Sequence, residues 1–527
     1  MMRQTSRREA LRIGAAGLAG AALSTRPRPG AAAETPPAAP GGHCIAAMSA
    51  ATETVDPHFS RSSAARNVLM HICESLVTID EHSSPQLQLA ETLETSPDYR
   101  RFTFTLRQGV PFHNSKELTA IDAQRSLERF ARISPEKARL ADIDRMSAPD
   151  KYRLVVELKS SVPAWIELLK SPASPMTIIP AELCDGAPNK VQPVSTGPYQ
   201  FADWDGATQI NMRRFKDYRP NTAYAGLDGY GGQRTVWFDE ATFKVIKEAS
   251  ARVAGLQTGQ FHLIDIIPVP AAKRLQGDKS FTIYDRIPNS ASVLVVNVAQ
   301  PPTDNLKLRQ AIQAVLNIDE ILSVAADGLY RPNPCWIYPD NAYYPKQASE
   351  LVYNVHDPAR AKALLQQSGY KGEELVLMAT SDYPYMRDVA VVASEEMKAI
   401  GINVRLDVMD WPGMTARAQN PKGFNMYSSA YAIQPMLGPF EFLRFFTGKQ
   451  NFSFAPPDQA IDDAFAKLFA ATTNEARSQA WWTIEQRVNE QVYELKIGDI
   501  GIKQASTARL RNFVPYDGMR LWNDWLS

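Results

Sequence analysis

Residues 357–408 alternate between helix and strand signals, and this alternation constrains the fold more than any other feature of the sequence. Asp357 can cap a helix, and the pattern then predicts a strand, a helix and a second strand at residues 375–379, 389–399 and 402–408. Two strands joined through a helix lie parallel in one sheet with a right-handed crossover. The sequence therefore predicts an α/β fold with a mostly parallel region.

Residues 89–130 predict a different kind of structure, a strand between two turns followed by a helix. Apolar and polar side chains alternate over residues 102–106, which is the period-two pattern of a half-buried strand. Gly109 breaks this strand, and Thr119 with Asp122 three positions later forms a variant of the capping box that opens a helix. This part of the chain therefore predicts a β-rich region beside the α/β part.

This order of elements resembles family 5 of the extracytoplasmic solute-binding proteins, the peptide-, nickel- and opine-type receptors of ABC importers. The sequence departs from the family's pattern at residues 114–116, where Asn-Ser-Lys replaces the usual Asp-Gly. This difference changes a turn and does not change a binding site. The matching motifs follow the family's order: LAETLETS at 89–96, FTFTLRQGVPF at 102–112, STGPYQFADW at 195–204, VLVVNVAQPPTDNLKLRQAIQAVLNIDEIL at 293–322, DPARAKALLQQSGY at 357–370 and IGINVRLDVMDW at 400–411.

The resemblance implies a two-lobed periplasmic-binding-protein fold of type II, in the large three-domain subclass with mixed sheets and an additional β-rich domain. In the family the first lobe is discontinuous in sequence, and the second lobe is a long insertion. Carried onto this chain, the expected limits are lobe I at 44–86, 196–290 and 498–527, the extra domain II at 87–195, and lobe II at 291–497.

The first residues indicate export. SRREALR at residues 6–12 is close to the twin-arginine consensus, and the apolar run at 13–23 is shorter than the roughly 20 residues that span a bilayer. Small residues before position 34 offer a cleavage site, so residues 1–33 are expected to be a signal peptide and 34–43 a flexible linker. The alternative is a disordered alanine-rich tail. His43 before Cys44 argues against a lipid anchor, so we expect a soluble periplasmic protein.

The charge balance and the cysteine and histidine positions limit the partners, disulfides and metal sites that can be expected. Lys+Arg and Asp+Glu are equal at 57 each and form no basic block, so neither nucleic acid nor an anionic membrane surface is expected as a partner. Four cysteines allow three disulfide pairings, and the sequence does not choose among them. Five of the seven histidines fall between positions 43 and 113, but none of their spacings suits a metal site on one helix. No metal and no cofactor are expected.

Two segments resemble the parts of the family that line the ligand cleft. The first contains Trp411, an aromatic platform or a core tryptophan, and Arg417, an anion anchor or a solvent-exposed arginine. The second segment covers residues 425–446, and the sequence leaves open whether its side chains contact the ligand or pack in the core. Its expected ligand-binding residues are Tyr427, Ser428, Tyr431 and Gln434. Near the N-terminus the expected contacts, with loop structure as the alternative, are Phe59, Arg61 and Ser62.

The second segment lacks an acid where peptide receptors of this family carry an aspartate for the ligand's amino terminus. Gln434 and Pro435 stand near that place, and the first acid of the segment is Glu441. A buried ammonium group without a counter-charge is strongly unfavourable. The sequence therefore favours a neutral or hydroxylated ligand, or an anion held by Arg417, over an ordinary peptide.

The predicted function is that of a periplasmic receptor of an ABC importer, which captures a small solute in an inter-lobe cleft and delivers it to the permease and ATPase subunits as a monomer. Modified peptides, opines, sugars and metal chelates remain open as ligands. The rival interpretations are a secreted hydrolase and a ligand sensor that serves a chemoreceptor. No G-x-S-x-G, P-loop or H-E-x-x-H motif occurs, so catalysis is not expected.

Overall fold

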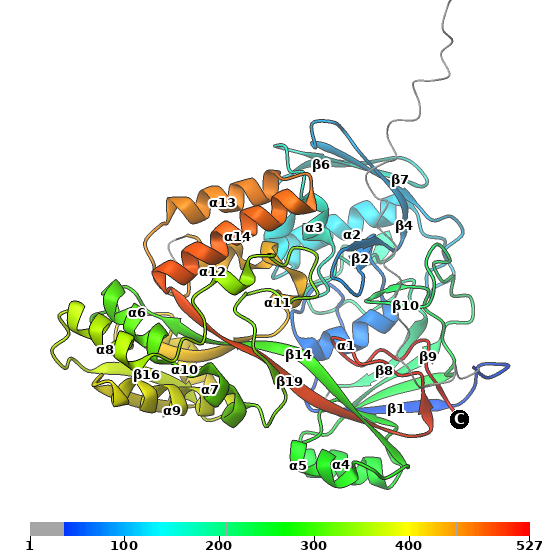
Figure 1. The fold of residues 1–527 in the computed structure, drawn as a ribbon. Coiled ribbons are helices and arrows are strands. Elements are labelled where there is room, and N and C mark those ends of the chain that lie inside the picture. The colour runs from blue at the N-terminus through cyan, green and yellow to red at the C-terminus, as the bar shows by residue number, and fades with distance from the viewer. Residues whose placement is uncertain (1–35, 207, 449–450) are drawn as a thin grey trace, which may run out of the picture. The chain divides into compact units, whose positions relative to one another are not determined.

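The computed structural model describes residues 36–206, 208–448 and 451–527 (Figure 1). The expected signal peptide at 1–33 and the first two residues of the expected linker lie outside the described residues. By its contacts the chain divides into two units, Met1–Pro36 and Pro37–Ser527, and everything below concerns the second unit.

Eleven strands of the described residues form one large sheet in the order β17-β16-β18-β14-β19-β13-β1-β12-β9-β8, with β15 beside β19. β16 is parallel to β17 and β18, and β1 is parallel to β12 and β13, while the other pairings are antiparallel. The strands are β1 (His43–Met48), β8 (Tyr199–Asp205), β9 (Gln209–Arg214), β12 (Glu240–Val245), β13 (Leu263–Ile264), β14 (Phe281–Val296), β15 (Tyr330–Arg331), β16 (Leu375–Thr380), β17 (Val404–Met409), β18 (Met426–Tyr431) and β19 (Glu494–Thr507).

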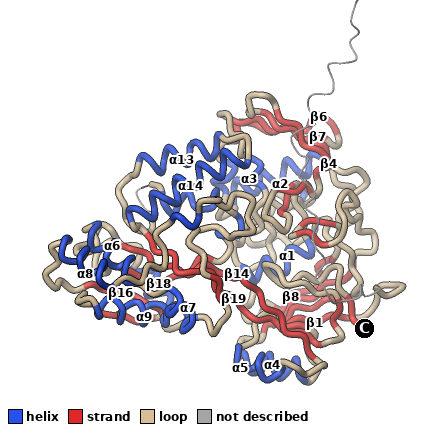
Figure 2. The backbone as a smooth tube through the Cα atoms, in the orientation of Figure 1, coloured by secondary structure: helices blue, strands red, loops and turns tan. Residues whose placement is uncertain are grey.

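Two long strands connect the halves of this sheet. β14 has 16 residues and β19 has 14, and they pair antiparallel along most of their length. The register shifts between Arg286 and Ser290, and again between Ser292 and Val293. Figure 2 shows this pair running from one group of strands to the other. We call β13-β1-β12-β9-β8 with their helices the first half-sheet, and β17-β16-β18 with theirs the second half-sheet.

Helices cover both faces of the second half-sheet (Figure 1). Buried side chains of α6, α7, α8 and α9 share one core with Leu294, Leu377 and Met426, and those of α13 and α14 share another with Val293, Val295 and Tyr427. These helices are α6 (Leu306–Val315), α7 (Ile318–Ala325), α8 (Pro358–Gln367), α9 (Pro384–Ala399), α13 (Gln459–Ala470) and α14 (Asn474–Gln491).

The predicted strand–helix–strand unit is confirmed as β16, α9 and β17, with the two strands parallel. Asp357 caps α8 by accepting a hydrogen bond from the backbone of Arg360. α9 begins at Pro384, five residues before the predicted start, because proline suits the first turn of a helix.

A separate four-stranded antiparallel sheet, in the order β4-β5-β7-β6, confirms the predicted β-rich region. The Asp122 carboxylate accepts from the Thr119 backbone N–H at 2.8 Å, as the capping box requires. Phe102, Phe104 and Trp165 are buried between this sheet and α2. This small-sheet region comprises β4 (Ala90–Thr95), β5 (Arg101–Leu106), β6 (Ile143–Asp150), β7 (Arg153–Leu158), α2 (Ala120–Ile133), α3 (Trp165–Leu169) and the 3-10 turn η1 (Lys137–Leu140).

Shorter helical elements and strand pairs complete the described part of the chain. β13 is only two residues long, and it connects β1 to β19 in the large sheet. Helical elements are α1 (Ser63–Ile72), α4 (Ala249–Gln257), α5 (Val269–Leu275), α10 (Trp411–Arg417), α11 (Gln434–Leu437), α12 (Leu443–Phe446), η2 (Ala181–Leu183), η3 (Ala348–Glu350) and η4 (Pro439–Phe442). Short strand pairs are β2 (Val77–Ile79) with β3 (Pro85–Leu87), β10 (Leu227–Asp228) with β11 (Gly231–Gly232), and β20 (Leu510–Arg511) with β21 (Trp525–Leu526).

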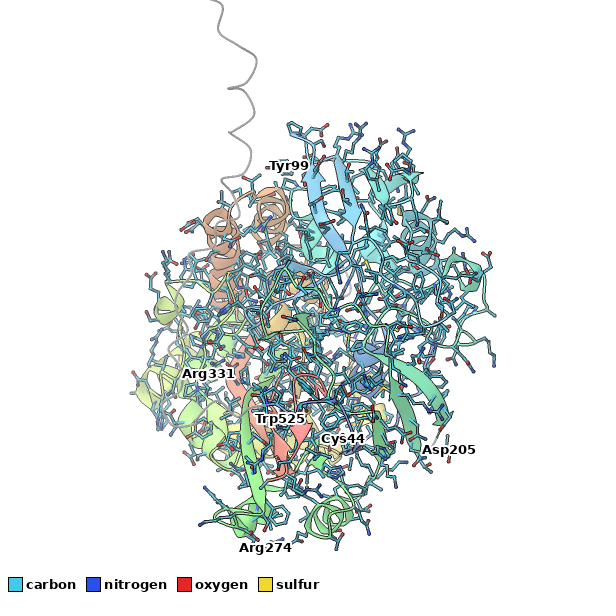
Figure 3. All side chains as sticks on the ribbon, turned by 90° about the vertical axis from the view of Figure 1, so that its right-hand side faces the viewer. Cys44, Tyr99, Asp205, Arg274, Arg331 and Trp525 are labelled. Atoms are coloured by element: carbon cyan, nitrogen blue, oxygen red, sulfur yellow. The ribbon has the colours of Figure 1, made fainter. Side chains whose placement is uncertain are left out.

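All four cysteines are buried free thiols, so none of the three disulfide pairings is formed. Figure 3 labels Cys44, which lies on β1 in the first half-sheet. Burial raises the pKa of the Cys184 thiol to about 11, which leaves little thiolate at neutral pH. Within the described ranges, we find no helix with the length and apolar character needed to cross a membrane.

Candidate functional site

In open α/β sheets, ligands bind outside the carboxyl ends of parallel strands. In the first half-sheet this rule selects the segments that follow the parallel strands β1, β12 and β13, and the loop at 49–62 after β1 is the one that contains predicted residues. In the second half-sheet it selects the turns after β16, β17 and β18, at residues 381–383, 410 and 432–433. We call these segments the carboxyl-edge segments. Of the residues predicted to bind a ligand, Arg417, Tyr427 and Ser428 lie farther along α10 or β18, and the segments contain or adjoin Phe59, Arg61, Ser62, Trp411, Tyr431 and Gln434.

The loop at 49–62 is fixed at its centre by a buried ion pair. The Arg129 guanidinium on α2 donates to both carboxylate oxygens of Asp56, at 2.7 and 2.6 Å, and neither side chain is more than 1% exposed. Burial alone would raise the pKa of Asp56, but the hydrogen bonds and charge of Arg129 hold it below its ordinary value. The loop is thereby attached to the small-sheet region.

The loop places Phe59, Arg61 and Ser62 close together at the start of α1. Phe59 is an exposed apolar side chain, and Arg61 pairs with Glu136 of the small-sheet region at 2.8 Å. Ser62 caps α1 by accepting from the backbone N–H of Ala65, and its hydroxyl donates to a carboxylate oxygen of Glu53. Ser62 thus has a clear structural role, while Phe59 and Arg61 remain accessible to a ligand.

Trp411 lies on the edge of the second half-sheet, as the first residue of α10. Its backbone N–H donates to Asp382 at 2.9 Å, and its ring meets Tyr383 edge to face at 5.4 Å between centroids. Tyr383 is 42% exposed, so the two rings form an accessible aromatic pair. Arg417, at the other end of α10, is already paired with Asp407. An anion at Arg417 would have to compete with that carboxylate.

The predicted residues of β18 point to opposite faces of the sheet. Tyr427 and Tyr431 belong to the aromatic core beneath α13 and α14, and alternation along the strand places Ser428 on the other face. Ser428 is fully buried, and its hydroxyl has no hydrogen-bond partner among the residues that the structure describes. Gln434 is half-buried at the start of α11. One ligand surface therefore cannot include both the tyrosines and Ser428 without rearrangement of the strand.

The structure adds an acidic residue that the sequence analysis missed. Glu494, the first residue of β19, accepts a hydrogen bond from the Tyr431 hydroxyl at 2.7 Å. Its other carboxylate oxygen is buried without a partner in the described part of the chain. Burial raises the pKa of Glu494 to about 8, so the carboxyl group is mostly protonated at neutral pH. No local signal links Glu494 to Tyr431, because 63 residues separate them.

The two half-sheets also meet through α11, and a cluster of charged residues holds β14 to the first half-sheet. Ile433 and Leu437 are buried in the core of the first half-sheet, together with Leu69 and Trp522. Beside β14, Asp517 pairs with both Arg66 and Arg286, each at 2.9 Å. These two arginines hold the pKa of Asp517 low against the opposing effect of burial.

On the other side of β19, Arg331, labelled in Figure 3, pairs with the fully buried Asp499 at 3.0 Å. Asp499 also pairs with the buried Lys496 at 2.7 Å. Charged side chains therefore flank the two connecting strands on both sides.

Two buried histidines, His58 and His71, act as neutral hydrogen-bonding groups of the interior. His58 contacts the carbonyl oxygen of Thr177, and His71 that of Asn67, at 2.8 and 2.7 Å. Burial lowers their pKa values to about 4 and about 3. Within the described ranges no group of three or more His, Cys, Asp or Glu residues is placed to hold a metal ion.

Comparison with known proteins places this geometry among solute receptors. The family model of bacterial extracellular solute-binding proteins, family 5 middle region, matches residues 84–454. The glutathione-binding protein GsiB of Salmonella paratyphi A is 25% identical over 404 residues, which cover 75% of this chain and 76% of that protein.

Solved structures show the same fold. The substrate-binding protein CtaP of Listeria monocytogenes superposes with a TM-score of 0.79 at 19% identity, covering 92% of this chain and 99% of that one. The binding protein AgaA of A. tumefaciens R10, solved with agropinic acid, gives 0.72 at 24% identity, covering 92% and 99%. The predicted two-lobed α/β fold of the periplasmic binding proteins is confirmed, whereas the domain limits and ligand-binding residues stay predictions.

Proposed function

The chain belongs to the family 5 bacterial extracellular solute-binding proteins, and from that membership we propose that it captures a small polar organic solute between two lobes and delivers it to a membrane permease. Members of this family bind small solutes and work with the permease and ATPase subunits of ABC importers. We identify lobe I with the first half-sheet, domain II with the small-sheet region and lobe II with the second half-sheet.

The observation that carries this proposal is the pair of long strands, β14 and β19, that joins the two half-sheets. A two-stranded connection lets the half-sheets rotate toward each other, as in the hinge closure of periplasmic binding proteins. The solute shifts the balance toward the closed form by its higher affinity for that form. Closure then presents a distinct surface to the permease.

We propose that no reaction takes place in the cleft. The relatives are binding proteins, and the sequence carries none of the nucleophile, phosphate-loop or zinc-protease motifs that a hydrolase would need. A ligand sensor would keep the same cleft and differ only in its partner. We further propose that the protein acts as a monomer in the periplasm, after export by the twin-arginine route that residues 6–12 indicate.

The proposed solute carries hydroxyl, amide or carboxylate groups and does not depend on a buried ammonium contact. Residues 425–440 contain no acid, and Glu494 beside Tyr431 is mostly uncharged at neutral pH. A ligand ammonium group would therefore find no ready counter-charge there. Glutathione and agropinic acid, the ligands named for two relatives, are the first solutes to test.

The test is mass spectrometry of small molecules released by denaturation from the natively exported protein. We expect one solute in near-equal molar amount, which raises the Tm of the stripped protein and is recovered unchanged after incubation. Recovery of a chemically altered solute would favour a hydrolase. If neither the released compounds nor the two named solutes shift the Tm, the capture function is refuted.

A further inference from the structure

We propose that domain II takes part in closing the receptor, through two ionic contacts with lobe II that position the lobes around a solute. The inference rests on the proposed function, because it assumes the hinge motion about β14 and β19. It adds that the population of the closed form depends on Arg139–Glu441 and on the contacts of Glu167 with Tyr343 and Arg477.

The first contact joins η1 of domain II to η4 of lobe II. One terminal nitrogen of Arg139 lies 3.0 Å from each carboxylate oxygen of Glu441. The side chains are 8% and 17% exposed, so solvent screens the pair less than a surface ion pair. Glu441 lies in η4, which is separated from α11 by Gly438 alone, and α11 is the element that lobe II buries against lobe I. The contact thus fixes the segment that also joins the two lobes.

The second contact is centred on Glu167 of α3, which is almost fully buried. One carboxylate oxygen accepts from the Tyr343 hydroxyl at 2.6 Å and from an Arg477 guanidinium nitrogen at 3.3 Å. Tyr343 and Arg477 both belong to lobe II, and Arg477 lies on α14. The Tyr343 ring also meets Phe440 edge to face, and Phe440 packs against Phe469 in the same way.

In domain II, each of the two charged side chains also has a second partner, which remains beside it when lobe II moves away. Arg139 also pairs with Glu136 at 3.4 Å, one turn earlier in domain II. Glu167 pairs with Lys170 at 2.7 Å, within the same helical segment. A buried charge left without any partner is strongly unfavourable, and these local pairs prevent that outcome for the two domain II side chains on opening. In lobe II, Arg477 keeps its contact with the Tyr343 hydroxyl at 3.2 Å. The contacts can therefore form and break reversibly, so they bias closure without locking it.

This bias bears directly on solute capture. When only a fraction of the receptor is in the binding-competent form, the apparent dissociation constant rises by the inverse of that fraction. The contacts with domain II raise the closed fraction before any solute arrives. Substitutions at Arg139, Glu441 or Tyr343 should therefore act on affinity without touching the solute.

The test measures closure directly, without a ligand, by the distance between two spin labels on the full-length mature protein. Labels at Ser147→Cys on β6 and Ala466→Cys on α13 report on domain II and lobe II, because both positions are exposed. The four native cysteines are buried, so the introduced thiols react selectively under native conditions.

The variants are Glu441→Gln, Tyr343→Phe and their combination, and each has a matched control within lobe II. Glu374→Gln removes an acid paired with Arg405 at 2.8 Å, and Tyr370→Phe removes a hydroxyl bonded to the Glu373 carbonyl at 2.6 Å. These controls change the same groups without touching domain II.

We expect the combined variant to lower the ratio of short to long distances about five- to tenfold. Each partly buried charged contact can change the equilibrium between the closed and open forms by up to about one order of magnitude. The control variants should leave the ratio unchanged. An unchanged distance distribution in the combined variant, or an equal shift in the controls, would overturn the proposal. The outcome is independent of the capture function, because solute-driven shortening in all variants would support capture even where this inference fails. A wild-type distance that never responds to a bound solute would refute the hinge itself.

Discussion

Replacing Glu494 by glutamine should stabilise the protein increasingly as the pH rises. The carboxyl group is 3% exposed, receives one hydrogen bond from Tyr431 and has one oxygen without a partner in the described structure. Burial raises its pKa from 4.5 to about 8. Between these values the folded protein binds a proton that the unfolded chain has released, so the free energy of unfolding falls as the pH rises.

The size of this change in the free energy of unfolding follows from the difference between the two pKa values. Each unit is worth about 1.4 kcal/mol, so the penalty grows by about 3 kcal/mol between about pH 5 and pH 8. Glutamine has the shape of the protonated acid and does not titrate. The variant should match the wild type near pH 5 and exceed its stability by about 3 kcal/mol near pH 8.

Urea unfolding of both proteins across this pH range measures the difference directly. Other buried acids, such as Glu485, titrate alike in both proteins and cancel in the comparison. Glu374→Gln is the matched control, because Glu374 is half-exposed and should show no such trend. A Glu494→Gln difference that stays constant with pH would mean that Glu494 is ionised in the folded protein, and the argument for an uncharged site would fail.

Three further outcomes are expected. Arg129→Met should cost about 3–5 kcal/mol in urea unfolding, because it leaves the buried Asp56 unpaired, and adding Asp56→Leu should recover much of that loss; no recovery would show that Arg129 acts through packing alone. Asp122→Ala should lower the free energy of unfolding by about 1 kcal/mol, through loss of the capping box of α2; an unchanged thermal midpoint would contradict this role. Trp411→Ala should weaken binding of the co-purified solute by about 1–3 kcal/mol in a calorimetric titration while the fold is kept; unchanged affinity would assign Trp411 to its contact with Tyr383.

Elements with strong local signals were predictable from the sequence. β5 and α2 carry a period-two pattern and a capping box, and α8 carries an aspartate cap followed by proline. The parallel pairing of β16 with β17 followed from the helix between them. In each case a short stretch of sequence contains the physical cause.

Contacts between distant residues were not predictable in this way. Glu494 reaches Tyr431, and Arg139 reaches Glu441, only because the chain folds back over 63 and 302 residues. No periodicity encodes such pairings. Glu494 lies on β19, outside the segment 425–446 that resembles the family's ligand-binding loop, so the resemblance does not point to it. Ser428 was grouped with Tyr427 and Tyr431, although alternation along β18 places it on the other face.

The burial of α11 against lobe I has a thermal consequence. Ile433 and Leu437 project from one lobe into the hydrocarbon interior of the other, so parting the lobes hydrates these side chains. Hydration of apolar surface increases the heat capacity, and it becomes less unfavourable on cooling. The open form of the receptor should therefore be more populated at low temperature. Its affinity for the solute should fall on cooling even if every polar contact with the solute is kept.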